Sequence, residues 1–288
     1  MRILSIQSSV AYGHVGNSAA TFPLQRLGHE VYPVLTVHFS NHTGYGSWRG
    51  QVLDPAVVAN VIAGIDDRGA LVGVDAVLTG YQGSPGVAEV VLDTVARVRE
   101  LNPRAVYCCD PVLGDVGRGM FVLPGVPELM RDRVVPVADI ITPNVFELAY
   151  LAGVDTAELV DLETLLAAVD RVRATGPSTV LVTSVEHLRG VASADDDAIG
   201  LLGVDPTGAF LVTTPHLPIS VNGAGDVTAA LFLAHLPQGI ESALAKVASS
   251  VHAILRRTVS SGAREIQLIQ AQDEIAAPAC EFEVVRVR

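Results

Sequence analysis

The chain has 288 residues, of which 49% are hydrophobic and 17% charged, and its formal net charge is −12. This length suits one large α/β domain or two small ones, and the apolar content excludes intrinsic disorder. The acidic balance argues against binding to nucleic-acid backbones, which select basic surfaces. No apolar run approaches the roughly 18 residues of a membrane span, and the opening run MRILSIQSSV is more typical of a strand than of a signal peptide. Three cysteines without a disulfide framework indicate a cytoplasmic protein.

Lysine usage narrows the chemistry further. Lys246 is the only lysine, and the sequence contains no GxxxxGK[ST] motif. Phosphate chemistry of the Walker type is therefore excluded, because that loop needs its lysine on the β- and γ-phosphates. Lys246 lies in a helical pattern, ESALAKVASSVHAIL, without site features around it, which disfavours a Schiff-base enzyme.

Short β-rich runs alternate with helical patterns along most of the chain, which predicts a mostly parallel sheet covered by helices on both faces. The segment 189–215 differs, because it is typical of short antiparallel strands joined by DDD and DPTG turns. No linker or internal repeat interrupts the pattern, so we expect one domain over residues 1–288. The predicted strands are 2–8, 30–40, 75–81, 104–112, 138–144 and 178–184, and the predicted helices are 16–28, 54–69, 85–102, 161–174, 227–236 and 240–258.

Polar residues gather where five of these strands end. In open α/β sheets, ligands bind outside the carboxyl ends of the strands, so this edge is the predicted site. The alternative is that strand ends simply turn at a polar surface. The clusters are Gln7-Ser8-Ser9, Ser40-Asn41-His42-Thr43, Gly80-Tyr81, Asp110 and Thr142-Pro143-Asn144.

The run VNGAGDVTAAL carries the strongest local signal. Gly223, Ala224 and Gly225 are small, and Asp226 precedes an apolar helix. Free N–H groups at a helix N-terminus form an anion site without any lysine, and an aspartate there can take a proton from an attacking hydroxyl. The alternative is structural: Asp226 caps the helix and the glycines form a tight turn.

Two further motifs supply acidic groups. In TPNVFE, Asn144 and Glu147 are three residues apart, which suits either a hydrated Mg²⁺ or a capping box. In CCDPVLGD, Asp110 ends a strand and Asp115 lies in a glycine-rich loop, and two acids beside a phosphate site require a cation between them. We expect Cys108 and Cys109 to be strand residues, one on each face of the sheet.

The loop HFSNHTGY has two histidines, His38 and His42, four residues apart. On a helix this spacing would indicate a metal pair, but the segment leaves a strand and soon reaches a glycine. We therefore interpret it as a polar and aromatic loop shaped for a small heterocycle.

Taken together, these motifs resemble those of pyridoxal kinases, in the ribokinase-like superfamily. The resemblance runs from about residue 2 to 271–276. NGAGD and TPNxxE mark the superfamily broadly, whereas HTGYGSWRGQ and the opening serine loop resemble the pyridoxal kinase branch. The runs that carry it are IQSSVAYGHVGNSAA, TVHFSNHTGYGSWRGQ, LTGYQGS, CDPVLGD, ITPNVFEL and NGAGD, in the family's order and spacing.

The resemblance implies a three-layer α/β/α sandwich, mostly parallel with an antiparallel edge, that phosphorylates the 5′-hydroxymethyl group of pyridoxal with ATP. Pyridoxine and pyridoxamine are commonly accepted in the family too. The product, pyridoxal 5′-phosphate, belongs to vitamin B6 salvage. The implied cofactors are Mg²⁺ and a monovalent cation, and the implied assembly is a cytoplasmic homodimer with neither nucleic-acid nor membrane partners.

The resemblance also implies residue roles. Asp226 matches the catalytic base, and Gly223, Ala224 and Gly225 match the pocket for the transferring phosphate. Some bacterial relatives carry lysine at the counterpart of Thr183, so hydroxyls take over that phosphate contact here. The implied pyridoxal contacts are Ser8, Val37, Phe39, Thr43, Gly44 and Tyr81. The implied ATP contacts are Asp110, Asp115, Thr142, Asn144, Glu147, Thr183, Ser184, Thr214, Pro215, His216 and Leu217, with Asp110 and Glu147 on the metal, through water.

Two alternatives stay open. The nearest is another ribokinase-like kinase, acting on a hydroxymethylpyrimidine or a sugar. The other is a protein that binds pyridoxal without catalysis, although a pure binder has no need of Asp226, Glu147 and Asp110.

Overall fold

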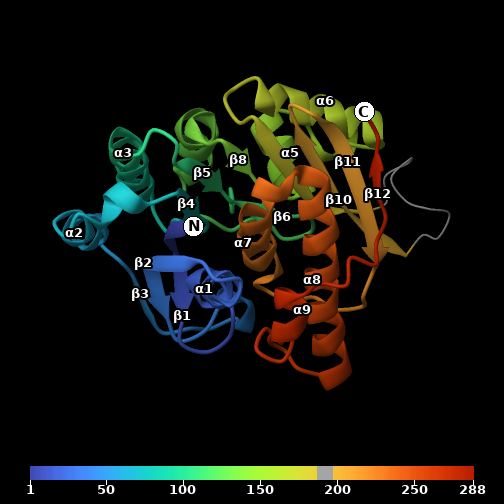
Figure 1. The fold of residues 1–288 in the computed structure, drawn as a ribbon, viewed down its shortest axis with the longest axis horizontal. Helices are drawn as coiled ribbons and strands as arrows, with labels where there is room; N and C mark the ends of the chain where they lie inside the picture. Colours follow the sequence, from blue (N-terminus) through green and yellow to red (C-terminus); the bar gives the residue numbers. More distant parts are fainter. Residues whose placement is uncertain (187–196) are drawn as a thin grey trace.

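The computed structural model describes residues 1–186 and 197–288 and contains a ten-stranded sheet in the order β12-β11-β10-β9-β8-β5-β4-β1-β2-β3 (Figure 1). The six strands from β9 to β2 pair in parallel, as the alternating pattern predicts. They are β1 (Arg2–Val10), β2 (Glu30–Phe39), β4 (Ala76–Thr79), β5 (Val106–Cys109), β8 (Ile140–Ile141) and β9 (Thr179–Val185).

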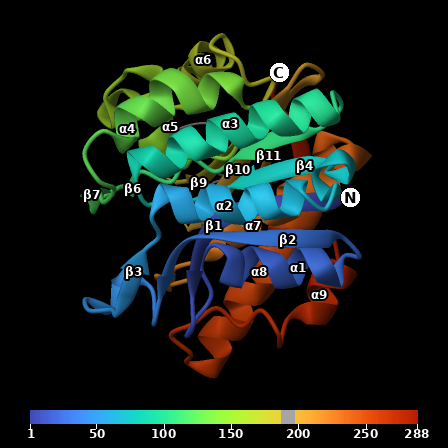
Figure 2. The same ribbon diagram turned by 90° about the vertical axis from the view of Figure 1, so that its left-hand side faces the viewer.

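Helices connect these strands at the predicted places and cover both faces. Figure 2 shows the sheet edge-on, with α3, α4 and α6 on one side and α1, α8 and α9 on the other. This confirms the three-layer architecture. The α-helices are α1 (Asn17–Arg26), α2 (Pro55–Asp66), α3 (Pro85–Leu101), α4 (Val126–Leu129), α5 (Val145–Ala152), α6 (Leu162–Arg173), α7 (Ala224–His235), α8 (Ile240–Ser261) and α9 (Gln272–Ala276).

The buried side chains form two clusters, one on each face of the sheet. Leu4 and Ile6 of β1 pack with α2 to α6, whereas Ile3 packs with α1, α7, α8 and α9. The two cysteines of β5 follow the same alternation, since Cys109 belongs to the first cluster and Cys108 to the second. Both thiols are free and buried, which confirms their expected placement on opposite faces.

Both edges of the sheet are antiparallel. β10 (Ala198–Asp205) and β11 (Gly208–Pro215) form the predicted hairpin through the DPTG turn, and the DDD turn lies largely outside the described residues. β3 (Gly50–Val52), on β2, and β12 (Val284–Arg286), on β11, were not predicted. A separate two-stranded sheet, β6 (Gly114–Asp115) with β7 (Gly119–Met120), folds the glycine-rich loop after β5 into a hairpin.

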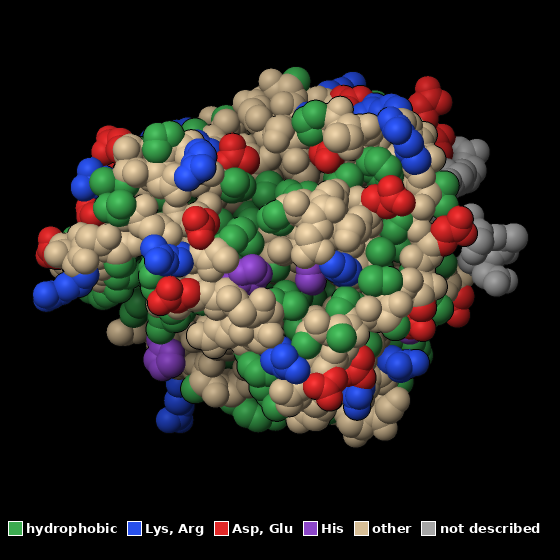
Figure 3. All heavy atoms as spheres, viewed as in Figure 1, with side chains coloured by type: hydrophobic (Ala, Val, Ile, Leu, Met, Phe, Trp, Pro, Cys, Tyr) green, Lys and Arg blue, Asp and Glu red, His purple; other side chains and the backbone are tan. Residues whose placement is uncertain are grey.

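Surface charge is mixed on the face seen in Figure 3, where basic and acidic side chains are interspersed. Within residues 1–186 and 197–288, no helix is both long enough and apolar enough to cross a membrane.

Candidate active site

A cavity of about 310 Å³ opens at the carboxyl ends of the parallel strands, where the sequence predicts the site. Ser8 comes from β1, Phe39 from β2, and Asp110 and Thr142 directly follow β5 and β8. The structure thus brings together residues from, or just beyond, the carboxyl ends of the six parallel strands and from the start of α7. The predicted residues that line the cavity are Ser8, Val37, Phe39, Thr43, Tyr81, Asp110, Asp115, Thr142, Asn144, Glu147, Thr183, Ser184, Gly223, Ala224, Gly225 and Asp226.

Five predicted residues lie outside this lining. Gly44 is close to it, since a Cβ on Gly44 would stand 2.6 Å from Asn222 Nδ2 and 2.9 Å from His42 Nδ1, two side chains of the cavity wall. Thr214 and Pro215 end the strand β11, and His216 and Leu217 follow it. His216 N donates to the carbonyl of Asp197 across the hairpin. Their predicted contact with adenine remains a prediction.

Gly223 is the N-cap of α7, with φ 91°, and it contributes no side-chain cap. Asp226 is the third residue of the helix, so the interpretation of Asp226 as a plain N-cap is wrong. A Cβ on Gly223 would lie 1.8 Å from the carbonyl oxygen of His14, which leaves room for glycine only. The first N–H groups of α7 therefore face the cavity without a capping side chain, as an anion site requires.

Burial raises the pKa of Asp226 to about 6. The backbone N–H groups of Gly16, in the loop between β1 and α1, and of Asp226 itself favour the charged carboxylate and oppose this shift. Asp226 is therefore ionised at neutral pH but basic enough to take a proton.

Asp110 is almost completely buried, with 6% of its surface exposed. Thr142 Oγ1 donates to Asp110 Oδ1 over 2.8 Å. Burial, followed by the charges of Glu147 and Asp226, raises the pKa of Asp110 well above its ordinary value. The charges of Glu147 and Asp226 thus act on Asp110 within one cavity, and a cation beside Asp110 would relieve this repulsion.

The side chain of Glu147 makes two sets of backbone hydrogen bonds. With Asn144 it forms the predicted capping box at the start of α5. Its Oε1 also accepts from the N–H groups of Leu113 (2.9 Å) and Gly114 (3.4 Å), which fixes the loop after β5. Burial raises the pKa of Glu147 to about 7, although these backbone donors oppose the shift. The capping box is confirmed, and the same carboxylate lies in the cavity wall.

The end of β9 reaches the cavity beside this box. Thr183 N donates to the carbonyl of Pro143 (2.9 Å), which brings Thr183 next to Asn144. Ser184 has φ 53°, an uncommon conformation for a residue other than glycine. Such strain concentrates at functional sites.

The other half of the cavity is more apolar. Val37 is buried and lines the cavity together with the aromatic side chains of Phe39 and Tyr81. The carbonyl of Tyr81 accepts from Thr36 Oγ1 (2.7 Å), and burial raises the pKa of the Tyr81 phenol. An aromatic wall beside the hydroxyls of Ser8 and Thr43 suits a flat heterocycle, as the sequence predicts.

Several lining residues were missed at the sequence level. Arg118 lies in the hairpin loop between β6 and β7 and is the one arginine among the described residues that line the cavity. Its guanidinium carbon lies 5.5 Å from the centroid of the Phe121 ring. Its only sequence signal is its place in the glycine-rich run GDVGRGM. The other lining residues to which the sequence assigned no ligand contact are Val10, Val15, His42, Val112, Gly114, Phe121, Val221 and Asn222.

The two histidines of the HFSNHTGY loop do not share a helix, since His38 lies on β2 and His42 in the loop after it. His38 is exposed on β2, whereas His42 is buried and lines the cavity. Among the described residues, no group of three or more His, Cys, Asp or Glu side chains is arranged to hold a metal.

A three-layer α/β fold with a helix N-terminus facing clustered carboxylates defines a kinase of the ribokinase-like fold. A sequence model of the phosphomethylpyrimidine kinase family matches residues 32–268. Pyridoxal kinase PdxY from Leifsonia xyli subsp. xyli is 56% identical over 100% of both chains, and its namesake from Rubrobacter xylanophilus is 57% identical over 100% of this chain and 98% of its own. The structure of pyridoxal kinase from Leishmania donovani with ADP and pyridoxamine superposes with a TM-score of 0.91 at 30% identity, over 100% of this chain and 99% of that one. The chain belongs to the pyridoxal kinase family.

Proposed function

We propose that this protein transfers the γ-phosphoryl group of ATP to the 5′-hydroxymethyl group of pyridoxal, giving pyridoxal 5′-phosphate for vitamin B6 salvage. One observation carries the proposal: Asp226, in the first turn of an uncapped helix N-terminus, shares a cavity with Ser8, Thr43 and Tyr81. Structures of the Leishmania donovani relative contain ADP with pyridoxine or pyridoxamine, which supports both halves of the reaction and acceptance of those two vitamers.

In this mechanism, Asp226 accepts the proton of the hydroxymethyl group as its oxygen attacks the γ-phosphorus. The N–H groups of Ala224 and Gly225 stabilise the charge on the transferring phosphoryl group, as Gly223 shapes their approach. Phosphoryl transfer depends on positioning and charge neutralisation, so this arrangement needs no covalent intermediate. Arg118 supplies positive charge from the opposite loop.

The carboxylates fit a Mg²⁺ ion that arrives with ATP. Mg²⁺ retains several waters and takes few protein oxygens, and it would neutralise charge on the phosphates. Asp110 and Glu147 would hold it. Both oxygens of Glu147 already accept backbone hydrogen bonds, which favours contact through water. We also propose a monovalent cation, without assigning its ligands.

The remaining roles follow the division of the cavity. We assign the pyridine ring to Ser8, Val37, Phe39, Thr43 and Tyr81, with Gly44 closing the loop above it. We assign the binding of the ATP phosphates to the residues around Asp110, and the contact with the adenine ring to the segment 214–217. The protein acts as a single domain, 1–288, in a cytoplasmic homodimer.

A kinase of hydroxymethylpyrimidine is the second candidate, because the matching family model carries the name of phosphomethylpyrimidine kinase. Release of ADP, measured by a coupled assay with Mg-ATP, distinguishes the two. We expect turnover with pyridoxal and at least about tenfold lower kcat/KM with hydroxymethylpyrimidine or ribose, the discrimination that one lost stacking or hydrogen-bonding contact gives. The reverse order of substrates contradicts the proposal.

A further inference from the structure

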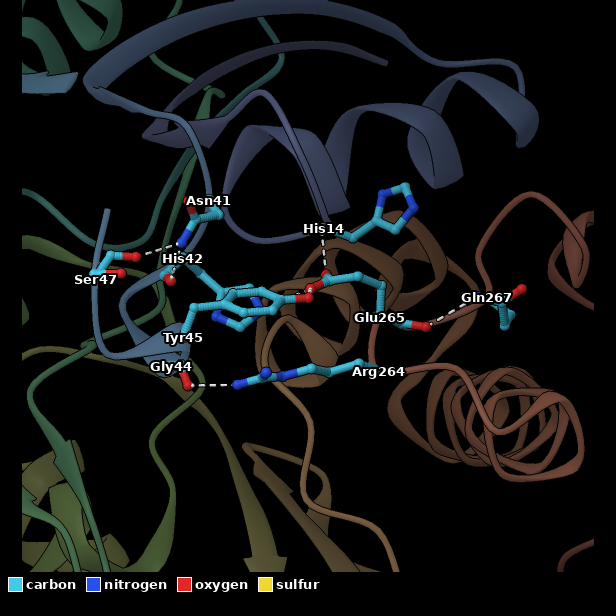
Figure 4. Close-up of polar contacts among 9 residues, drawn as sticks. All are labelled: His14, Asn41, His42, Gly44, Tyr45, Ser47, Arg264, Glu265 and Gln267. Atoms are coloured by element: carbon cyan, nitrogen blue, oxygen red, sulfur yellow. Dashed lines mark hydrogen bonds and ion pairs between the residues drawn. The ribbon is translucent and has the colours of Figure 1, made fainter. Parts of the chain in front are cut away.

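Glu265 joins three segments that are far apart in the sequence (Figure 4). Its Oε1 accepts from His42 Nε2 (3.0 Å) and from the Tyr45 hydroxyl (2.6 Å). Its Oε2 accepts from the backbone N–H of His14 (3.1 Å). The side chain is 11% exposed, so these bonds are largely shielded from water.

Arg264 strengthens the same junction from the other side. Its guanidinium lies over the Tyr45 ring, 3.8 Å from the centroid, and donates to the carbonyl of Gly44 (3.0 Å). The short helical turn Thr43–Tyr45 is therefore attached to the loop after α8 by both residues. Thr43 and His42, at the base of that turn, line the cavity.

The loop that carries Glu265 is itself fixed. Ile266 and Leu268 are buried in the core beside α7 and α8. Gln267 N donates to the buried Thr258 hydroxyl, and the Gln267 side chain donates to the carbonyl of Glu265, each over 3.0 Å. A rigid loop thus presents the carboxylate to a turn that lies mostly outside the core.

The carboxylate also determines the state of His42. Oε1 of Glu265 accepts this hydrogen bond, so Nε2 is its donor, and in the Nε2–H tautomer Nδ1 is a hydrogen-bond acceptor. His42 Nδ1 is buried and has no partner within the protein. His42 is 7% exposed and lines the cavity, and its unpartnered Nδ1 lies beside Gly44, since a Cβ there would stand 2.9 Å from it; a donor on a ligand bound against Gly44 would satisfy this atom.

A second connection runs toward the phosphate side. Glu265 holds the N–H of His14, and the carbonyl of His14 is the atom that a Cβ on Gly223 would meet at 1.8 Å. The same Cβ would stand 3.1 Å from Ile266 Cδ1. Glu265 is thus linked to both walls that the substrate has to touch.

We propose that Glu265 is a positioning residue for the aromatic substrate: it fixes the tautomer and orientation of His42 and holds the Thr43–Tyr45 turn over the cavity, so that Nδ1 accepts from a hydroxyl on the bound ring. The proposal rests on the function proposed above. It deepens that function by naming a residue outside the cavity that sets recognition of the vitamin.

The test compares E265A and E265Q with a matched control, E274Q. Glu274 lies on α9 and pairs with Arg257, outside the cavity. Pyridoxal and ADP affinities are measured by calorimetric titration, and each Tm is recorded. We expect E265A to weaken pyridoxal about ten- to hundredfold, the effect of losing a charged hydrogen-bond partner, with ADP affinity within about twofold of wild type. E265Q keeps one acceptor oxygen and should be intermediate, and E274Q should bind both ligands normally.

A double-mutant cycle with H42A identifies the route. If Glu265 acts through His42, adding E265A to H42A should weaken pyridoxal binding much less than E265A does alone. Equal effects in both backgrounds, or equal losses of ADP and pyridoxal affinity, overturn the proposal. E265Q, which retains an acceptor, provides the same comparison if E265A does not fold. Wild-type turnover with pyridoxal is measured first, because its absence contradicts the proposed function rather than the role of Glu265.

Discussion

Asn144 and Glu147 hydrogen-bond in both directions: Asn144 N donates to Glu147 Oε2 (2.9 Å), and Glu147 N donates to Asn144 Oδ1 (2.8 Å). This reciprocal pair begins α5 and at the same time places a buried carboxylate beside Asp110 and Asp226. The capping box and the proposed metal support can therefore share one geometry and need not be competing explanations of the motif.

E147Q separates the two contributions. An amide has a single acceptor oxygen, so we expect some loss of stability and, because outer ligands tune metal affinity, a Mg²⁺ requirement raised about tenfold or more. Half-saturating Mg²⁺ is measured at saturating ATP and pyridoxal. The control is E158Q, which changes an exposed capping box formed with Asp155. If E147Q lowers only stability and keeps ordinary Mg²⁺ dependence, Glu147 is a helix cap alone.

The raised pKa values predict how stability depends on pH. Asp226 and Glu147 have pKa values of about 6 and about 7 in the folded protein, above the ordinary 3.8 and 4.5. At a pH between the ordinary and the raised pKa of each group, the folded state therefore binds more protons than the unfolded state. Without Mg²⁺ or nucleotide, this contribution to the free energy of unfolding is most favourable below about pH 4 and is lost as the pH rises through about 6 to 7.

Urea denaturation at pH 5.5 and pH 8.0 checks this slope. We expect D226N to show a smaller decrease in unfolding free energy over this interval than wild type, because its side chain does not titrate. An identical decrease in both proteins means that Asp226 has an ordinary pKa in the folded state.

Tyr81 tests the division of the cavity. Removing its ring should weaken pyridoxal binding about tenfold, since aromatic stacking contributes roughly 0.5–1.5 kcal/mol and 1.4 kcal/mol is one decade. ATP binding should hardly change, because its proposed contacts lie around Asp110, Thr142 and Thr183. The comparison is Y81A against Y81F, which keeps the ring, with both ligands titrated. A loss confined to ATP, or shared equally by both ligands, shows that the division is wrong.

Gly223 and Gly28 form a matched pair, with φ 91° and 83°. A Cβ on Gly28 meets nothing within 4 Å, whereas one on Gly223 meets the His14 carbonyl at 1.8 Å. We expect G28A to cost roughly 1 kcal/mol of stability through backbone strain alone. G223A should cost about 1–3 kcal/mol more through the steric clash, and should also lower kcat. Chemical denaturation and turnover of both variants measure the difference, and equal behaviour contradicts the close approach of the two loops.

Local signals predicted much of this protein. Alternating strands and helices fixed the parallel sheet, and the spacing of Asn144 and Glu147 indicated the capping box, since both depend on residues close in sequence. The start of α7 depends on backbone conformation that no local motif specifies, because the positive φ of Gly223 places the N-cap three residues ahead of Asp226. The edge strands β3 and β12 have three residues each, too few to show a period.

The local sequence does not predict residues that act through contacts between distant parts of the chain. Glu265 meets Tyr45 across 220 positions of sequence, and no local pattern marks either as a partner of the other. Arg118 reaches the cavity only because a short hairpin turns its loop inward. Local motifs therefore identified residues that line the cavity, whereas the contacts of Glu265 with the Thr43–Tyr45 turn become visible only in the fold.

The most direct test of the account is formation of pyridoxal 5′-phosphate by wild type and D226N at saturating Mg-ATP and pyridoxal. Asparagine preserves the size of the side chain but cannot accept the proton, so we expect the rate to fall by roughly 10²-fold or more, with unchanged affinity for ADP. The wild-type kcat/KM should also decrease as the pH falls through about 6, where Asp226 becomes protonated. A D226N enzyme that forms the product at nearly the wild-type rate contradicts the assignment of Asp226 as the base.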